Sequence, residues 1–148
     1  MRKVALIVEG HGDQHAIPTL VTKTAQVFGV TAFAAHPIRA GGLLRLLRPG
    51  ELEKYAEMAG SRPDADAIVL VVDIDDGCAA EMSRLLSERL APIAERFGKD
   101  FGICLCVREY ESWLLEEVEY IRENCPDYEW AEGFECQNPE NIRGRKSY

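Results

Sequence analysis

The sequence lacks several patterns that would assign a function directly. No GxxxxGK[ST] loop occurs, which argues against a P-loop nucleotide hydrolase. Its five cysteines include no CxxC pair, so we expect reduced thiols rather than a zinc site. The apolar run at residues 4–8 is too short for a signal peptide or a membrane span. We therefore expect a cytoplasmic protein with no membrane partner.

The chain has no surplus of basic residues. The chain has 17 Lys and Arg against 25 Asp and Glu, a formal net charge of −8. This balance argues against a general nucleic-acid coat protein but not against a nuclease, because acidic residues are the ligands of hard cations. Arg39, Arg45, Arg48 and Arg62 lie in the first half and are candidates for phosphate contacts. A solvated surface of mixed charge is the simpler interpretation of any single one.

The hydrophobic pattern predicts one α/β domain in 148 residues. We expect strands at residues 3–8, 30–36, 67–72 and 101–107. Helical spacing follows at 17–28, in short helices at 43–47 and 51–58, at 82–97 with a kink at Pro92, and at 111–122. This alternation predicts a four-stranded, mainly parallel sheet with helices on both faces. We expect residues 1–110 to form the core. Residues 111–148 are expected to form an acidic helix and loop extension of the same domain, with a truncated end left open as an alternative.

Acidic side chains follow three of the predicted strands. Glu9 comes after the first, Asp73 and Asp75 after the third, and Glu111 shortly after the fourth. In a parallel sheet these strand ends meet at one edge, where ligands bind. Close carboxylates repel one another unless a proton or cation lies between them, and Mg²⁺ (or Mn²⁺) prefers oxygen ligands. The pattern therefore predicts a divalent metal site for phosphate chemistry.

The Asp-x-Asp segment has two other interpretations. An EF-hand calcium loop fails, because Gly77 is fifth rather than sixth from Asp73 and the twelfth residue is Arg84. Capping of the following helix by Asp73 or Asp75 stays open at this point.

The loop after the first strand offers further candidates. Gly10 and Gly12 allow a sharp turn, and their amides at a helix start could accept an anion. His11 could assist proton transfer or contact phosphate, whereas His15 is equally well explained as a residue of the helix start. His36, at the end of a strand, is better explained by structure than by ligand binding.

An ordered set of short motifs resembles a known family. Val8-Glu9-Gly10 ends the first strand, and Asp73-Ile74-Asp75 ends an apolar strand later in the chain. This arrangement, over residues 1–110, resembles the Toprim domain of topoisomerases, primases and overcoming-lysogenisation-defect nucleases. The resemblance implies a Rossmann-like Toprim fold, with Glu9 as general acid or base and the two aspartates as magnesium ligands.

A narrower similarity concerns Toprim-like domains found beside ATPases in bacterial abortive-infection systems. The segment from Arg108 to Leu114 and the tail from Asn138 to Lys146 carry it. It implies that Glu111 is a further metal-site acid, that Lys146 contacts phosphate, and that the chain works in phage defence with an ATPase partner. The sequence departs from the longer Asp-x-Asp-x-Asp pattern at Gly77, which puts a two-metal site in doubt.

The function we expect is magnesium-dependent phosphodiester chemistry on nucleic acid, with DNA, RNA and nucleotide substrates and a homodimer left open. The candidate site has catalytic Glu9 and His11, metal-binding Glu9, Asp73, Asp75 and Glu111, and substrate-binding Gly10, Gly12, Arg39 and Lys146. One alternative is a haloacid-dehalogenase-like phosphatase with Asp73 as nucleophile. Another is a non-catalytic interaction module that uses the acidic segment at residues 109–140.

Overall fold

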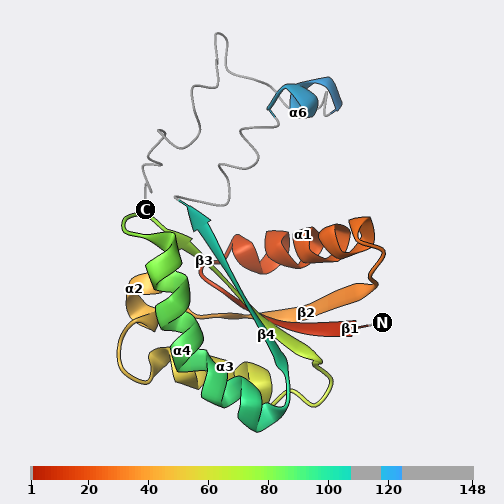
Figure 1. The fold of residues 1–148 in the computed structure, drawn as a ribbon. Coiled ribbons are helices and arrows are strands. Elements are labelled where there is room, and N and C mark those ends of the chain that lie inside the picture. Colours follow the sequence, from red (N-terminus) through yellow and green to blue (C-terminus); the bar gives the residue numbers. More distant parts are fainter. Residues whose placement is uncertain (1, 108–117, 125–148) are drawn as a thin grey trace.

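A four-stranded sheet organises the chain in a computed structural model that describes residues 2–107 and 118–124 (Figure 1). The elements are, in order, β1 (Arg2–Val8), α1 (Asp13–Val27), β2 (Ala32–Arg39), α2 (Leu43–Leu46), α3 (Glu51–Gly60), β3 (Ala67–Ile74), α4 (Ala79–Phe97), β4 (Asp100–Val107) and α6 (Val118–Asn124). The predicted α/β class is confirmed.

The strand order is β2-β1-β3-β4, and every neighbouring pair is parallel. Parallel neighbours require crossover connections, which here contain the helices. In Figure 1, α1 lies on one face of the sheet, and α3 and α4 lie on the other. The chain therefore leaves β1 toward one face and β3 toward the opposite face. The strand order reverses between these two central strands: β2 is added on one side of them and β4 on the other.

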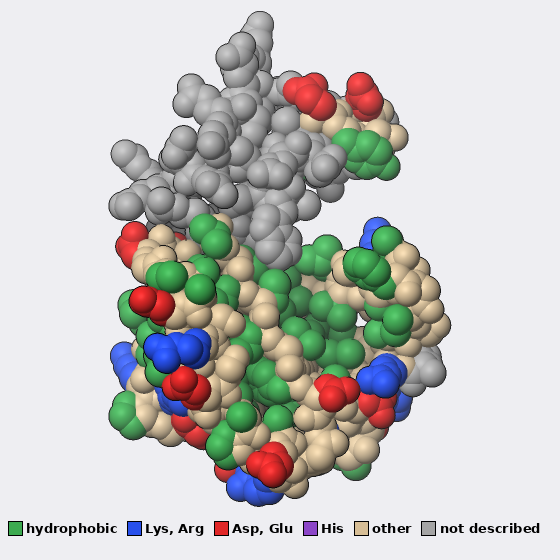
Figure 2. Space-filling model, viewed as in Figure 1, with side chains coloured by type: hydrophobic (Ala, Val, Ile, Leu, Met, Phe, Trp, Pro, Cys, Tyr) green, Lys and Arg blue, Asp and Glu red, His purple; other side chains and the backbone are tan. Residues whose placement is uncertain are grey.

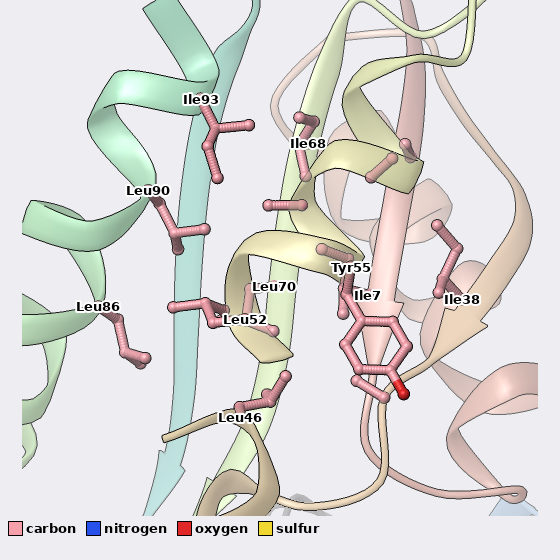
Figure 3. Close-up of a cluster of buried hydrophobic side chains, with 14 of the residues drawn as sticks. Ile7, Ile38, Leu46, Leu52, Tyr55, Ile68, Leu70, Leu86, Leu90 and Ile93 are labelled. Atoms are coloured by element: carbon pink, nitrogen blue, oxygen red, sulfur yellow. The ribbon is translucent and has the colours of Figure 1, made fainter. Parts of the chain in front are cut away.

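Each face of the sheet buries its own hydrophobic cluster. Figure 3 shows the larger one, in which side chains of α3 and α4 point toward β1 and β3; it includes Ile7, Leu52, Ile68, Leu70 and Leu86. The smaller cluster, under α1, is formed by Leu6, Val8, Ile17, Ala34, Val71 and Cys106. The β3 strand contributes to both clusters, which explains its unbroken apolar sequence.

The second strand differs most from its expected bounds. It runs to Arg39 rather than ending at His36, and it includes Pro37, which an edge strand tolerates because one side makes no ladder. Its pairing with β1 shifts between Ala5 and Ile7, and His36 there has a φ of 42°. One extra residue in β2 is therefore accommodated at His36.

The helices follow the predicted pattern with two qualifications. The α4 helix continues through Pro92 from Ala79 to Phe97, so this proline does not end or divide it. The helix expected at 111–122 is described only from Val118 onward, as α6. Among the described helices, none is long and apolar enough to cross a membrane.

Gly60, at the end of α3, provides a test of the packing between α3 and α4. A Cβ at this position would overlap the Phe97 ring. We expect Gly60→Ala to lower the free energy of unfolding by about 1–3 kcal/mol, measured by chemical denaturation. Gly60→Ala with Phe97→Leu should recover part of this loss.

The matched control is Gly102→Ala, whose new methyl would lie in ordinary contact with Val69, 3.5 Å away. An equal loss of stability in Gly60→Ala and Gly102→Ala would contradict the close packing of Gly60 against Phe97.

Candidate functional site

A small cavity lies at the carboxyl edge of the two central strands. Its volume is about 270 Å³. It is lined by Glu9, Gly42, Leu43, Leu44, Asp73, Asp75 and Asp76. The connections after β1 and β3 leave on opposite faces, and this is the place where open parallel sheets bind ligands. The structure therefore brings together the three acids that the sequence singled out in its first two motifs.

Glu9 is held in place from two sides. Its Oε2 accepts a hydrogen bond from the backbone N–H of Asp73 at 3.2 Å. Its backbone carbonyl accepts one from the N–H of Gly41 at 3.1 Å. A Cβ on Gly42 would lie 3.4 Å from Glu9 Oε1, so this glycine packs directly against the carboxylate. The Glu9 side chain thus joins the end of β1 to β3 and to the loop before α2.

The aspartates follow from the end of β3. Asp73 is half-buried within the strand, Ile74 points into the protein with 3% exposure, and Asp75 and Asp76 are exposed. The capping interpretation of Asp73 and Asp75 is wrong, because the residue that precedes α4 is Cys78 and no side chain caps this helix. The two carboxylates instead lie along the cavity.

The glycine loop after β1 is arranged differently from the expectation. The N–H of Gly10 donates to Asp13 Oδ2 at 2.6 Å, so its donor is already engaged by this chain. Gly12 precedes the first residue of α1. His11 is exposed and its ring lies 5.7 Å from that of His15. Gly10, His11 and Gly12 directly follow Glu9 in the sequence, but they are not among the residues that line the cavity.

The predicted basic residues do not line the cavity either. Arg39 pairs in register with Val8 and is exposed at the same edge of the sheet. Arg45 donates from Nε to Glu51 Oε2 at 3.0 Å, and this bond raises the pKa of Arg45. On the face that Figure 2 shows, basic and acidic side chains lie next to one another, as expected for a solvated surface of mixed charge.

Two predicted site residues, Glu111 and Lys146, lie outside the described residues. Sequence reasoning missed one wall of the cavity, formed by Gly42, Leu43 and Leu44. Leu44 is 84% exposed, so an apolar side chain lies at the mouth of an acidic cavity. The Gly41-Gly42 pair between a strand and a helix was the available signal, since adjacent glycines mark a backbone that needs unusual dihedral angles.

The donor set determines which cation the cavity suits. Within the described parts of the chain, no three His, Cys, Asp or Glu side chains come together closely enough to hold one metal ion. Carboxylate oxygens nevertheless match Mg²⁺, which is commonly bound through one or two carboxylates and keeps several waters. The described residues therefore fit a weakly caged magnesium ion and do not form a closed structural metal site.

Two cysteines lie close to this edge. Cys106 pairs in register with Asp73, and Cys104 and Cys106 contribute to the same buried cluster, as their alternation predicts. The hydrogen bond with Cys106 lowers the pKa of Cys104 to about 7. The same bond, together with burial, raises the pKa of the Cys106 thiol. Cys104 is thus the more easily ionised member of the pair.

A comparison with family models matches residues 8–147 to the family described as domain of unknown function DUF4276. The chain belongs to this family. The match begins one residue before Glu9 and spans the three aspartates of the cavity, so the acidic site lies within the DUF4276 region. No curated protein matches the sequence. The description of the DUF4276 family assigns it no activity.

The backbone of Gly42 yields a prediction about Glu9. Its φ of 70° and ψ of 148° belong to a region almost restricted to glycine, and its Cα faces Glu9. We expect Gly42→Ala to lower the free energy of unfolding by about 1–3 kcal/mol. It should also shift the side-chain carboxyl ¹³C resonance of Glu9, measured by NMR.

Gly50→Ala is the control for Gly42→Ala. Gly50 also precedes a helix with positive φ, 78°, but a Cβ there would meet nothing within 4 Å. This substitution should cost about 1 kcal/mol and leave the Glu9 resonance in place. A Glu9 resonance unmoved by Gly42→Ala would contradict the described contact.

The cysteine pair predicts a pH-dependent reactivity. A lowered pKa means that the Cys104 thiolate is already half-populated near pH 7, where an ordinary thiol with a pKa of about 8.5 is mostly protonated. Alkylation of Cys104 by iodoacetamide, followed by peptide mass spectrometry, should rise with a midpoint near pH 7. Cys106→Ala should move the midpoint up by one unit or more. A midpoint that Cys106→Ala leaves unchanged would refute the pairing.

Proposed function

We propose that this DUF4276 protein is a Toprim-like, magnesium-dependent enzyme that acts on phosphodiester bonds of nucleic acid. The observation that carries the proposal is the pairing of Glu9 with Asp73 at the carboxyl edge of β1 and β3. Both residues line the cavity at the position where open parallel sheets bind their ligands. A role for this pair in fold alone would not require Asp75 and Asp76 in the same cavity.

Electrostatics supports a bound cation. Four carboxylates line one cavity in a chain whose formal net charge is already −8. Such a group attracts divalent cations and repels phosphate until a cation offsets its charge. When bound, magnesium would neutralise charge on a phosphate and polarise its oxygens. In this proposal Asp73 and Asp75 hold the metal ion, with Glu111 as a further candidate ligand.

The role of Glu9 follows from how it is held. One carboxylate oxygen accepts the Asp73 amide hydrogen, and the other lies against Gly42. A fixed carboxylate can orient a water molecule and accept its proton, which is the work of a general base. His11, on the neighbouring loop, remains a candidate for proton transfer, and Gly10, Gly12, Arg39 and Lys146 remain candidates for substrate contacts.

The apolar wall supports a nucleotide rather than a small phosphate monoester. Leu43 and Leu44 face the cavity, and Leu44 is largely exposed at its mouth. Apolar side chains contact sugars and bases favourably, whereas a bare phosphate gains nothing from them. This observation favours nucleic acid over the substrates of a haloacid-dehalogenase-like phosphatase.

The surrounding partners are proposed on the resemblance alone. The Toprim-like domains of abortive-infection systems occur beside ATPases, and we propose the same setting, in the cytoplasm, for this chain. The net negative charge fits such a division of labour, because acidic residues outnumber basic ones and give the protein little affinity of its own for nucleic acid. An ATPase partner would then supply most of the affinity.

The test combines metal binding and cleavage. Mg²⁺ and Mn²⁺ are titrated calorimetrically into the wild type, Glu9→Gln and Asp73→Asn, and labelled single- and double-stranded DNA and RNA are assayed in the same samples. We expect Asp73→Asn to weaken metal binding at least tenfold, and cleavage to fall about 10²–10⁴-fold in both variants. Asp100→Asn is the control, because this aspartate lies at the opposite end of β4 and pairs with Arg2.

Two outcomes would reject the proposal in different ways. Hydrolysis of a phosphate monoester that survives Glu9→Gln but not Asp73→Asn would indicate the phosphatase. Wild-type protein that binds neither cation would leave a non-catalytic interaction module as the better account.

A further inference from the structure

Arg89 connects three helices on one face of the sheet. Its Nε and Nη2 donate to the two carboxylate oxygens of Glu53 on α3, each at 2.7 Å. Its Nη1 donates to the carbonyls of Leu46 and Leu47, at 3.2 and 3.5 Å, and its Nη2 to that of Arg48 at 3.2 Å. The Arg89 side chain is 20% exposed. Its guanidinium thus bridges α4, α3 and the end of α2.

The carbonyls that Arg89 contacts lie at the end of α2 and in the two residues after it, and that of Arg48 also accepts from the N–H of Glu51 at 3.3 Å. The last carbonyls of any helix lack intrahelical partners, and in a four-residue helix they are most of its carbonyls. A guanidinium with several donors in a fixed plane can serve a carboxylate and adjacent carbonyls together. Arg89 therefore supplies the C-terminal hydrogen bonds that hold α2 in place.

The other end of α2 is the apolar wall of the cavity. Gly42, Leu43 and Leu44 line it, and Gly42 packs against Glu9. A series of contacts accordingly runs from Arg89 through α2 to the carboxylate that we propose as the general base. Arg89 is not among the residues that line the cavity, so any effect on chemistry must pass through α2.

We propose that Arg89 is a positioning residue for the acidic cavity, which fixes α2 so that Gly42 and the two leucines keep their place against Glu9. The effect on cleavage rests on the proposed function, but the effect on α2 does not. The hydrogen bond to Arg89 also lowers the pKa of Glu53, consistent with a well-formed pair.

The chain contains a close control for Arg89. Arg96 also lies on α4 and also pairs with a glutamate of α3, Glu57, at 2.8 Å. This second pair joins the same two helices but makes no described hydrogen bond to α2. Arg89→Lys and Arg96→Lys therefore each weaken a link between α3 and α4, although the Arg96 pair is the more exposed of the two, and only Arg89→Lys removes donors from the α2 carbonyls.

Hydrogen exchange is the first readout. The amides of Arg45, Leu46 and Leu47 donate hydrogen bonds to backbone carbonyls at the start of α2, those of Gly42 and Leu43. They should exchange at least tenfold faster in Arg89→Lys than in Arg96→Lys. If Arg89→Lys does not fold, Glu53→Asp replaces it, since the shorter carboxylate draws the guanidinium from α2 and should raise exchange several-fold. Equal exchange in the Arg89 or Glu53 variant and in Arg96→Lys would overturn the proposal.

Cleavage and metal affinity provide the second readout. Arg89→Lys should lower kcat tenfold or more while the Mg²⁺ affinity stays within twofold, because Asp73 and Asp75 are untouched; unchanged kcat would overturn the positioning role. If the wild type cleaves nothing, the proposed function fails. The Arg89 inference is then decided by the carboxyl ¹³C resonance of Glu9, which must move in Arg89→Lys and stay in place in Arg96→Lys.

Discussion

Two adjacent parallel strands, β1 and β3, send the chain to opposite faces of the sheet, and the candidate site depends on this divergence. If both connections crossed the same face, helices would crowd the carboxyl edge. Here α1 turns to one side and α4 to the other. The hydrogen bond from the Asp73 amide to Glu9 links the ends of these two strands, so the backbone of β3 orients the acid that follows β1.

The sequence was most informative where the residues of the candidate site directly follow a strand. The unbroken apolar run of β3 predicted a strand buried on both faces, and the acids that follow β1 and β3 were placed at one edge by the rule for parallel sheets. The sequence thus predicted that Glu9, Asp73 and Asp75 lie at one edge of the sheet, and these three residues line the same cavity. Their proposed chemistry stays a prediction, because neither the fold nor the DUF4276 match specifies a reaction.

The missed parts depend on contacts between residues distant in sequence. Leu44 reads as an ordinary helix residue, and only the packing of α2 beside β3 brings it to the cavity. Arg89 reads as one more charge on the polar side of α4, and its partners are 36 to 43 positions away. The longer β2 was missed because Pro37 usually ends a strand, which an edge position relaxes. No periodicity within one element reports such pairings.

The register shift at His36 has a consequence for how β2 serves the two hydrophobic clusters. Side chains two or four positions apart in a regular strand share a face, yet Ala34 belongs to the cluster under α1 and Ile38 to the cluster under α3. The additional residue reverses the alternation of side chains between the two faces. The first half of this eight-residue edge strand therefore contributes to the cluster under α1, and the second half to the cluster under α3. The one extra residue in β2 thus changes which face of the sheet the following side chains occupy.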